Sequence, residues 1–124
     1  MAPAEPEAPR DCARCPRLVA YRESNRGARP DWFNAPVPSF GDPEARLLVV
    51  GLAPGLSGAN RTGRPFTGDY EGDLLYGTLA GTGFTRGIYE ARADDGLALG
   101  DAMITNAVRC VPPENRPTGK EIAN

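Results

Sequence analysis

The pattern of apolar and polar segments along the chain predicts the order strand, loop, helix, strand. An unbroken apolar run, L-L-V-V, predicts a strand over about residues 46–50, and the glycine that follows directly is typical of a strand that is buried on both faces. Few helix breakers occur in residues 70–81, which predict a helix, and residues 102–105 predict a second buried strand that ends at Asn106. This order indicates an α/β fold in which a parallel sheet is flanked by helices and the functional loops lie at the carboxyl ends of the strands.

Further helices are predicted near the two ends of the chain. Pro16 can occupy the first turn of a helix that runs to about residue 25. Thr118 and Glu121 have the spacing of a capping box, which predicts that a helix begins there. The turn-rich, acidic segment before the second strand predicts no more than a short helix around residues 88–92.

The length of 124 residues is that of one small domain. Residues 1–10 are mostly Pro, Ala and Glu without apolar periodicity and predict a disordered tail. Because the helix predicted after residue 118 has barely begun when the sequence stops, we expect residues 11–124 to be the N-terminal part of a single, truncated domain. No run approaches the length of a membrane span and no secretory signal is recognisable, so we expect a cytoplasmic protein.

The segment after the first predicted strand, residues 51–69, is the candidate for chemistry. Its sequence is G-L-A-P-G-L-S-G-A-N-R-T-G-R-P-F-T-G-D, in which glycines allow a close backbone approach to a ligand and many hydrogen-bonding groups surround one aromatic ring. It is not a nucleotide-binding fingerprint, because it lacks the G-K-[ST] ending of a P-loop and the G-x-G-x-x-G spacing. The alternative interpretation is a Gly-rich surface loop.

Three cysteines form a second candidate site. Cys12 and Cys15 form a C-x-x-C, and Cys110 lies in the segment V-R-C-V-P-P. A redox pair would need a preceding strand, which the sequence does not predict. A closed zinc or iron-sulfur site needs four ligands, and this chain has three cysteines and no histidine. Metal binding and three unligated, buried thiols therefore both remain open from the residues alone.

The net charge of −2 argues against a generally basic, nucleic-acid-binding surface. All of the 14 basic residues except Lys120 are arginine, whose guanidinium can bind a phosphate through two parallel hydrogen bonds. A solvated charged face would have a similar composition. Charge therefore predicts local contacts to phosphate at most.

Taken together, the motifs resemble the iron-sulfur branch of the uracil-DNA glycosylase superfamily. G-L-A-P-G at residues 51–55 and N-R-T-G-R-P-F-T-G-D at residues 60–69 are similar to motif 1 of this family, in its type b (family 5) form. The C-x-x-C and the segment V-R-C-V-P-P resemble the segments that carry the first three cluster cysteines. The resemblance implies a uracil-DNA glycosylase-like α/β fold and a DNA repair hydrolase that flips uracil out of the duplex and cleaves its N-glycosidic bond.

The resemblance also implies where the base is bound. Phe66 stacks on the flipped base, while the backbone amides of Gly51, Leu52 and Ala53 donate to a carbonyl oxygen of the base. Asn106 matches the asparagine that pairs with uracil in type a enzymes, although type b enzymes often have a small residue there. From the residues alone, Phe66 can equally be a core aromatic and Asn106 a strand-end cap.

For the chemical step, Asp69 matches an aspartate that is implicated in type b enzymes. Other branches of the family have a charged or polar group that can activate water at the position where this chain has Leu52. Asp69 need not replace that group as a strong base, because its negative charge alone would stabilise a cationic sugar. Asn115 is the second catalytic candidate, and its alternative role is that of a turn asparagine. Arg61 and Arg64 are expected to contact the flanking DNA phosphates.

The cofactor implied by the resemblance is a [4Fe–4S] cluster bound by Cys12, Cys15 and Cys110, with the fourth ligand outside this chain and zinc as the alternative metal. The implied partner is uracil-containing DNA, and we expect a monomer without membrane contact. The family's later His-containing motif is missing, so the fragment alone is expected to be inactive. A non-catalytic nucleic-acid-binding zinc or iron-sulfur module is the alternative function, but it leaves residues 51–69 without a role.

Overall fold

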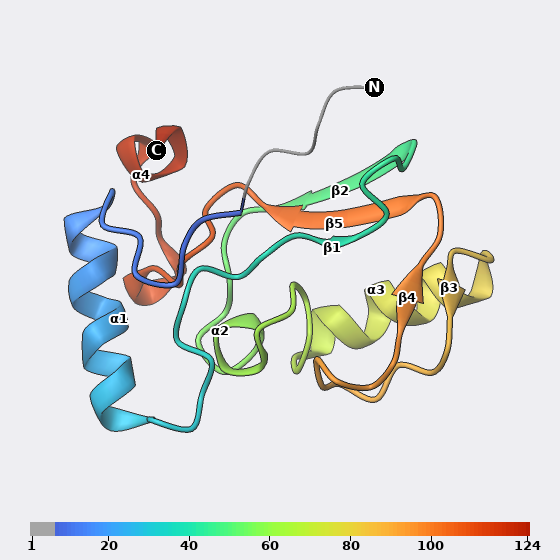
Figure 1. Ribbon diagram of the computed structural model, residues 1–124, viewed down its shortest axis with the longest axis horizontal. Helices are drawn as coiled ribbons and strands as arrows, with labels where there is room; N and C mark the ends of the chain where they lie inside the picture. Colours follow the sequence, from blue (N-terminus) through green and yellow to red (C-terminus); the bar gives the residue numbers. More distant parts are fainter. Residues whose placement is uncertain (1–6) are drawn as a thin grey trace.

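A three-stranded sheet forms the centre of the computed structural model, which describes residues 7–124 (Figure 1). The strand order is β1-β5-β2, with β2 parallel and β1 antiparallel to the middle strand β5, and a second, two-stranded sheet pairs β3 with β4. In chain order the elements are α1 (Pro16–Ala28), β1 (Phe40–Gly41), β2 (Leu47–Gly51), α2 (Ala59–Thr62), α3 (Tyr70–Gly81), β3 (Thr85–Arg86), β4 (Ala98–Leu99), β5 (Ala102–Asn106), the 3-10 turn η1 (Pro113–Asn115) and α4 (Gly119–Ala123).

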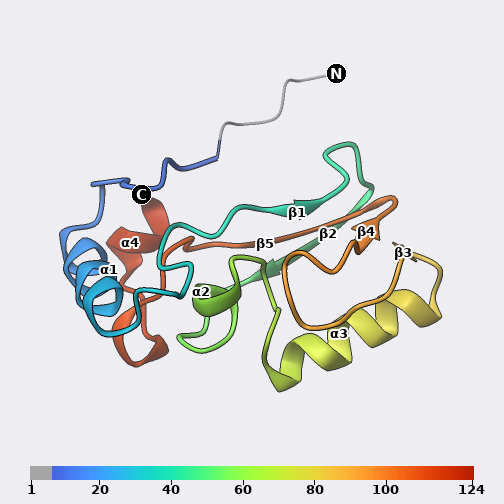
Figure 2. The same ribbon diagram turned by 60° about the horizontal axis from the view of Figure 1, so that its bottom comes forward.

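The predicted strand–helix–strand unit is confirmed. β2 and β5 are paired in parallel from the partners Leu47 and Ala102 to the partners Gly51 and Asn106, so both strands end at the same edge of the sheet. Helix α3 lies below the sheet in Figure 2 and packs its apolar side against it. The resulting core cluster consists of Tyr76, Leu79, Leu97, Leu99, Ala102 and Ile104.

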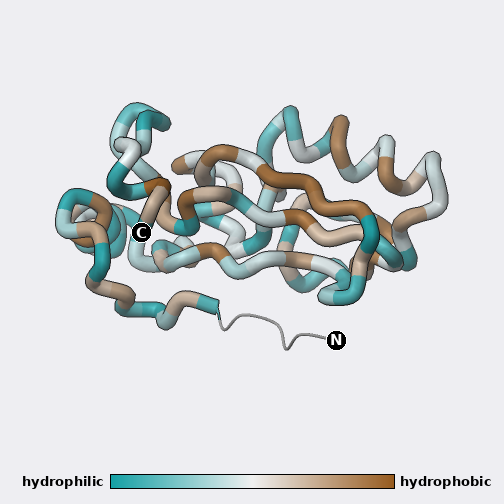
Figure 3. Tube along the Cα trace, turned by 90° about the horizontal axis from the view of Figure 1, so that it is seen from above, coloured by the Kyte–Doolittle hydropathy of each residue, from teal (hydrophilic) through white to brown (hydrophobic). Residues whose placement is uncertain are grey.

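The prediction that the first strand is buried on both faces is wrong. β2 is at the edge of the sheet, and the side chains of Leu48 and Val50 are 56% and 57% exposed. Helices α2 and α3 both lie on the other side of the sheet in Figure 2, and nothing among the described residues covers this face of β2. In Figure 3, brown stretches of hydrophobic residues run along the middle of the molecule.

The short helix expected around residues 88–92 is also absent from the described part of the chain, which has irregular structure and bends there instead. The physical reason is the carboxylate of Asp95, which accepts hydrogen bonds from the backbone amides of Glu90 (2.9 Å) and Leu97 (3.0 Å). A side chain that binds local backbone amides in this way replaces the hydrogen bonds of a helix. The strands β1, β3 and β4 were not predicted, because two residues carry no periodicity.

The predicted terminal helices are confirmed. α1 begins at Pro16 and continues to Ala28, and both hydrogen bonds of the capping box form at the start of α4. The carboxylate of Glu121 in this box also accepts hydrogen bonds from Nε (2.9 Å) and Nη2 (2.6 Å) of Arg17. This pair joins α1 to α4 at one end of the molecule (Figure 1).

Part of the predicted disordered tail, residues 1–6, lies outside the described residues. Next to it, Glu7 accepts hydrogen bonds from Arg109 and from the backbone amide of Ser39, and the carbonyl oxygen of Arg10 accepts one from Arg26. No helix in residues 7–124 is long and apolar enough to cross a membrane.

Candidate active site and cysteine cavity

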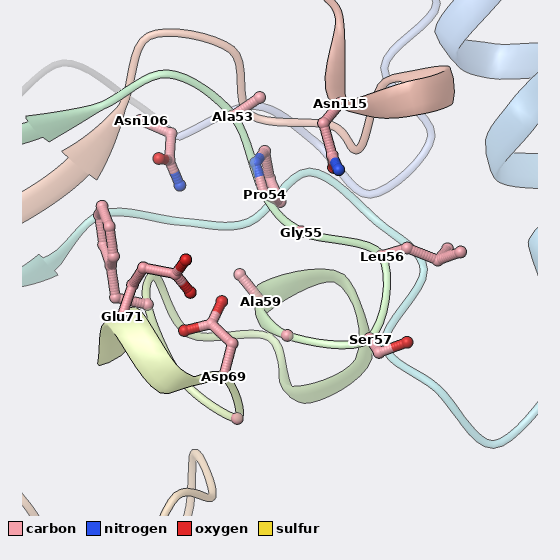
Figure 4. A pocket seen from close by; sticks show the side chains of 13 residues that line it. Ala53, Pro54, Gly55, Leu56, Ser57, Ala59, Asp69, Glu71, Asn106 and Asn115 are labelled. Carbon is pink, nitrogen blue, oxygen red and sulfur yellow. The ribbon is translucent and has the colours of Figure 1, made fainter. Parts of the chain in front are cut away.

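A pocket of about 500 Å³ opens at the carboxyl ends of β2 and β5 (Figure 4). This is the edge of a parallel sheet at which α/β proteins bind their ligands. In Figure 4 the amides of Asn106 and Asn115 lie on one side of the pocket, and the carboxylates of Asp69 and Glu71 lie on the other. The structure therefore brings together most of the residues that were predicted to bind the base or to act in the chemical step: Ala53, Phe66, Asp69, Asn106 and Asn115 all line this pocket.

Gly51 leaves room for two of these side chains. A Cβ atom added at Gly51 would contact Oδ1 of Asn106 and lie 2.6 Å from Cζ of Phe66. Because side chains do not tolerate such contacts, glycine at this position is what allows the Phe66 ring and the Asn106 amide to meet at the strand ends. The carbonyl oxygens of Gly51 and Leu52 accept from the backbone amides of Ala107 (2.8 Å) and Val108 (2.9 Å), which fixes this loop to the end of β5.

Phe66 has a backbone conformation that non-glycine residues rarely adopt, with φ at 54°. Its ring is half-buried between Gly51 and the pocket, and its carbonyl oxygen lies directly against Gly72 of α3. Strained backbone of this kind costs of the order of 1–3 kcal/mol and persists only where the surroundings impose it. Phe66 is therefore held in place by its neighbours, and its ring remains accessible from the pocket.

Asp69 is the N-cap of α3. Its Oδ1 accepts from the backbone amide of Gly72 at 2.8 Å, while Oδ2 faces the glycines of the 51–58 loop. Glu71, in the first turn of the same helix, is a second pocket carboxylate that our sequence interpretation missed. The sequence could have indicated this role, because Glu71 is two residues after the N-cap Asp69 and side chains in the first turn of a helix lie near the cap.

Asn106 and Asn115 differ in how firmly they are held. Asn106 is buried at the end of β5, and its backbone carbonyl accepts from Nε of Arg109 at 3.1 Å. Asn115 is exposed in η1, with φ at 57°, and approaches the pocket from the turn after Cys110. The first is built into the sheet and the second belongs to a surface turn.

The two predicted phosphate-binding arginines have different environments. Arg61 is exposed, and its guanidinium lies along the loop, where it donates to the carbonyl oxygens of Ser57 (2.7 Å) and Gly68 (3.5 Å). The prediction for Arg64 is wrong, because its side chain is only 4% exposed and already forms an ion pair with the fully buried Asp95. A phosphate cannot reach this guanidinium.

Buried charge at this pair changes both pKa values. Burial acts to lower the pKa of Arg64, but its hydrogen bonds to Asp95 raise that pKa above its ordinary value. The same hydrogen bonds from Arg64, together with those from the amides of Glu90 and Leu97, hold the pKa of Asp95 far below its usual range. Both groups are therefore charged over the whole physiological pH range.

The three cysteines line a second cavity, of about 580 Å³, between the start of α1 and the turn after β5. None of them forms a disulfide bond. Cys15 directly precedes the first turn of α1, which places Cys12 and Cys15 on the segment that leads into the helix. Within residues 7–124 no three side chains of the metal-binding types lie close enough to one another to form a ready metal site.

The donor set and its surroundings nevertheless fit an anionic, thiolate-bound group. Arg22, on the buried side of α1, extends Nη1 to 4.0 Å from Sγ of Cys110, and its buried Nε has no hydrogen-bond partner within the described chain. A buried guanidinium with an unused donor is costly unless negative charge lies nearby; Oε1 of Glu23 is 4.0 Å from this Nε, and a thiolate at Cys110 would supply a second negative charge. Burial raises the pKa of the Cys110 thiol, and Arg22 partly opposes this shift.

Comparison with known proteins identifies the family of the chain. A family model described as the uracil DNA glycosylase superfamily matches residues 38–124. The Type-5 uracil-DNA glycosylase of Thermus thermophilus is 50% identical over 117 residues, which cover 90% of this chain and 52% of that protein. The Type-5 uracil-DNA glycosylase of Pyrobaculum aerophilum is 46% identical over 118 residues (92% and 52%), and the Type-4 uracil-DNA glycosylase of the same organism is 36% identical over 112 residues (90% and 43%).

The chain thus spans about half the length of the curated relatives it matches. The match to the family model covers well over half of the chain, including β2, β5 and the loop between them. The α/β fold expected from the sequence is the fold of this family, and the chain belongs to the uracil-DNA glycosylase superfamily.

Proposed function

We propose that this chain carries the base-binding and catalytic groups of a DNA repair glycosylase that cleaves the N-glycosidic bond of uracil in DNA. The observation that carries the proposal is the convergence of Phe66, Asn106 and Asp69 on one pocket at the ends of two parallel strands. An aromatic ring can stack on a flipped base and an amide can read its edge. A carboxylate can stabilise the cationic sugar that forms as the bond breaks. The names of its relatives support uracil-containing DNA as the substrate.

Recognition of the base would use the Phe66 ring and the Asn106 amide, which both lie against Gly51 and line the pocket. The Phe66 ring stacks on the flipped base, and the Asn106 amide accepts a hydrogen bond from uracil N3–H and donates one to O4. The amides of Leu52 and Ala53 lie on a loop that is fixed to β5, from which they donate to a carbonyl oxygen of the base. Negative charge that develops on the departing base is stabilised by these donors.

The chemical step would depend on the charge of Asp69. As the glycosidic bond breaks, the sugar becomes cationic, and a fixed carboxylate stabilises it without having to remove a proton. The hydrogen bond from the amide of Gly72 orients this carboxylate, because it fixes Oδ1 and leaves Oδ2 on the loop side. Asn115, across the pocket, holds the attacking water.

A [4Fe–4S] cluster would be held by Cys12, Cys15 and Cys110, and it supplies no chemistry to the reaction. It ties the segment before α1 to the turn after β5, two parts of the chain that are almost a hundred residues apart in sequence. Arg22 compensates the negative charge of the thiolates.

Arg61, at the rim of the loop, binds a phosphate next to the flipped nucleotide.

The test is uracil release from an oligonucleotide with a single dU, by intact protein purified from a host that lacks its own uracil-DNA glycosylase. Asp69→Asn should lower the single-turnover rate by about 10²-fold and leave DNA affinity nearly unchanged, because the charge acts mainly in the transition state. Glu71→Gln is the matched control, since it removes the neighbouring pocket carboxylate. DNA binding without any uracil release would favour the alternative, a non-catalytic nucleic-acid-binding module.

A further inference from the structure

A buried polar network is centred on Arg64, in the same loop as Phe66. Its Nη1 and Nη2 donate to the two carboxylate oxygens of Asp95 at 2.7 and 2.9 Å, and its Nε donates to Oγ1 of Thr67 at 2.8 Å. All three nitrogens of the guanidinium are therefore used. The arrangement is a bidentate pair with one additional, directed hydrogen bond.

Three aromatic rings surround this guanidinium. Its Cζ lies 4.9 Å from the ring centre of Phe40, 5.3 Å from that of Tyr76 and 5.6 Å from that of Tyr89. The two tyrosine rings are stacked at 4.7 Å, and Phe40 meets Tyr76 edge-on at 6.3 Å. Cation–π contacts and the planar fork fix the guanidinium in one orientation, which a lysine could not reproduce.

The network holds the residues on both sides of Phe66. The carbonyl oxygen of Pro65 accepts from the hydroxyl of Tyr76 at 2.6 Å and from Oγ1 of Thr67 at 3.1 Å. Thr67 is in turn held by Nε of Arg64, and its carbonyl oxygen accepts from Oγ1 of Thr62 at 2.9 Å. Phe66 itself, with its left-handed backbone, is thus the only residue of the 65–67 segment that projects toward the pocket.

Asp95 comes from the turn-rich segment between β3 and β4, to which the sequence assigned no role. This carboxylate accepts four hydrogen bonds, two from Arg64 and one each from the amides of Glu90 and Leu97. Tyr89, in the same segment, adds a hydroxyl at 3.5 Å from the amide of Gly68. The segment therefore acts as a support for the loop that carries Phe66.

We infer that Arg64 and Asp95 are positioning residues that hold the Phe66 ring in its stacking orientation. This inference rests on the proposed function, in which Phe66 stacks on the flipped base. A buried ion pair is weak evidence for a role in stability, because apolar residues of similar size are often as stable or more stable. What this pair supplies is a defined orientation, since it ties the strained loop to the segment between β3 and β4 at two defined oxygen atoms.

The double substitution Arg64→Met with Asp95→Asn tests this role in the intact protein. It removes both charges and leaves an acceptor at residue 95 for a backbone amide. The matched control is Arg46→Met with Asp101→Asn, which removes an ion pair of the same two residue types from the surface, where Arg46 is 89% exposed and donates two hydrogen bonds to Oδ2 of Asp101. Amide hydrogen exchange of residues 66–69 is measured without DNA, with α1 as the internal reference for global stability.

We expect amide exchange of residues 66–69 to accelerate at least about 10-fold relative to α1 in the first double variant and to stay unchanged in the control. Single-turnover uracil release should fall by about 10²-fold with DNA affinity retained, since small displacements of a reacting group have effects of this size. Unchanged exchange of the loop relative to α1 would overturn the inference. Absence of uracil release by the unsubstituted protein would instead refute the proposed function. The exchange measurement is made without DNA, so it tests whether Arg64 and Asp95 hold the loop independently of that outcome.

Discussion

The backbone of Gly58 lies directly against the carboxylate of Asp69. A Cβ atom added at Gly58 would lie 2.6 Å from Oδ2 and 3.2 Å from Cγ of Asp69. The glycine loop after β2 and the N-cap of α3 are thus in contact, and the loop sets how far the carboxylate can turn. Asp69 is confined by Gly58 on one side and by its hydrogen bond to the amide of Gly72 on the other.

This contact predicts that Gly58→Ala displaces the Asp69 carboxylate. We expect a loss of about 10²-fold in the single-turnover rate of uracil release, close to the loss from removing the charge itself. Gly77→Ala is the control, because a Cβ at Gly77 in α3 would meet nothing within 4 Å. Equal activities of the two variants would show that the carboxylate has room to move without consequence.

Base selection is predicted to depend on the Asn106 amide. Asn106→Asp replaces the donor to uracil O4 by an acceptor that suits the amino group of cytosine, so uracil excision should fall and relative activity on cytosine should rise. A buried polar mismatch of this kind can support discrimination of about 10⁴-fold. The two rates are measured on otherwise identical oligonucleotides, with Asn106→Ala alongside. Parallel loss of uracil activity and stability in both variants, without gain on cytosine, would make Asn106 a structural residue.

The cysteine cavity is predicted to hold iron. In the intact protein Cys15→Ala should lose bound iron and soluble yield together, because ligand binding and folding are coupled at such sites. The optical spectrum and metal analysis measure this directly and distinguish iron from zinc. Ala13→Ser, between the two N-terminal cysteines and exposed, is the control and should keep the metal. A colourless, metal-free and normally folded intact protein would contradict the prediction.

The aromatic environment of the Arg64 network predicts a loss of stability in alkali. Burial raises the pKa of Tyr76 from 10.0 to about 12, so the unfolded chain loses this proton first. The corresponding stability is present below pH 10 and is lost as the pH rises from about 10 to about 12, with a total of about 2–3 kcal/mol. Denaturant unfolding across this range should show a flatter pH dependence for Tyr76→Phe. Tyr70→Phe, with Tyr70 79% exposed, should behave like the unsubstituted protein.

Local signals were sufficient for much of the fold. The parallel strands, the long helix and the capping box each follow from residues that are close in sequence, and all were predicted. The site was partly accessible in the same way, because parallel strands bring their carboxyl ends together and so place Asn106 near the loop after β2. The exposed face of β2 was not predictable, because a short apolar run has the same sequence pattern in an edge strand as in a central strand.

The sequence by itself determined which chemical groups are available: the glycine loop with Phe66 and Asp69, the strand-end amide and the three thiols. Only the tertiary structure decided how they are used. Arg64 lies in the same motif as Phe66, yet it turns inward because Asp95, 31 residues later, supplies a buried counter-charge. Whether an arginine binds a phosphate or a carboxylate depends on which partner the fold brings to it, since a buried guanidinium is stable only when paired.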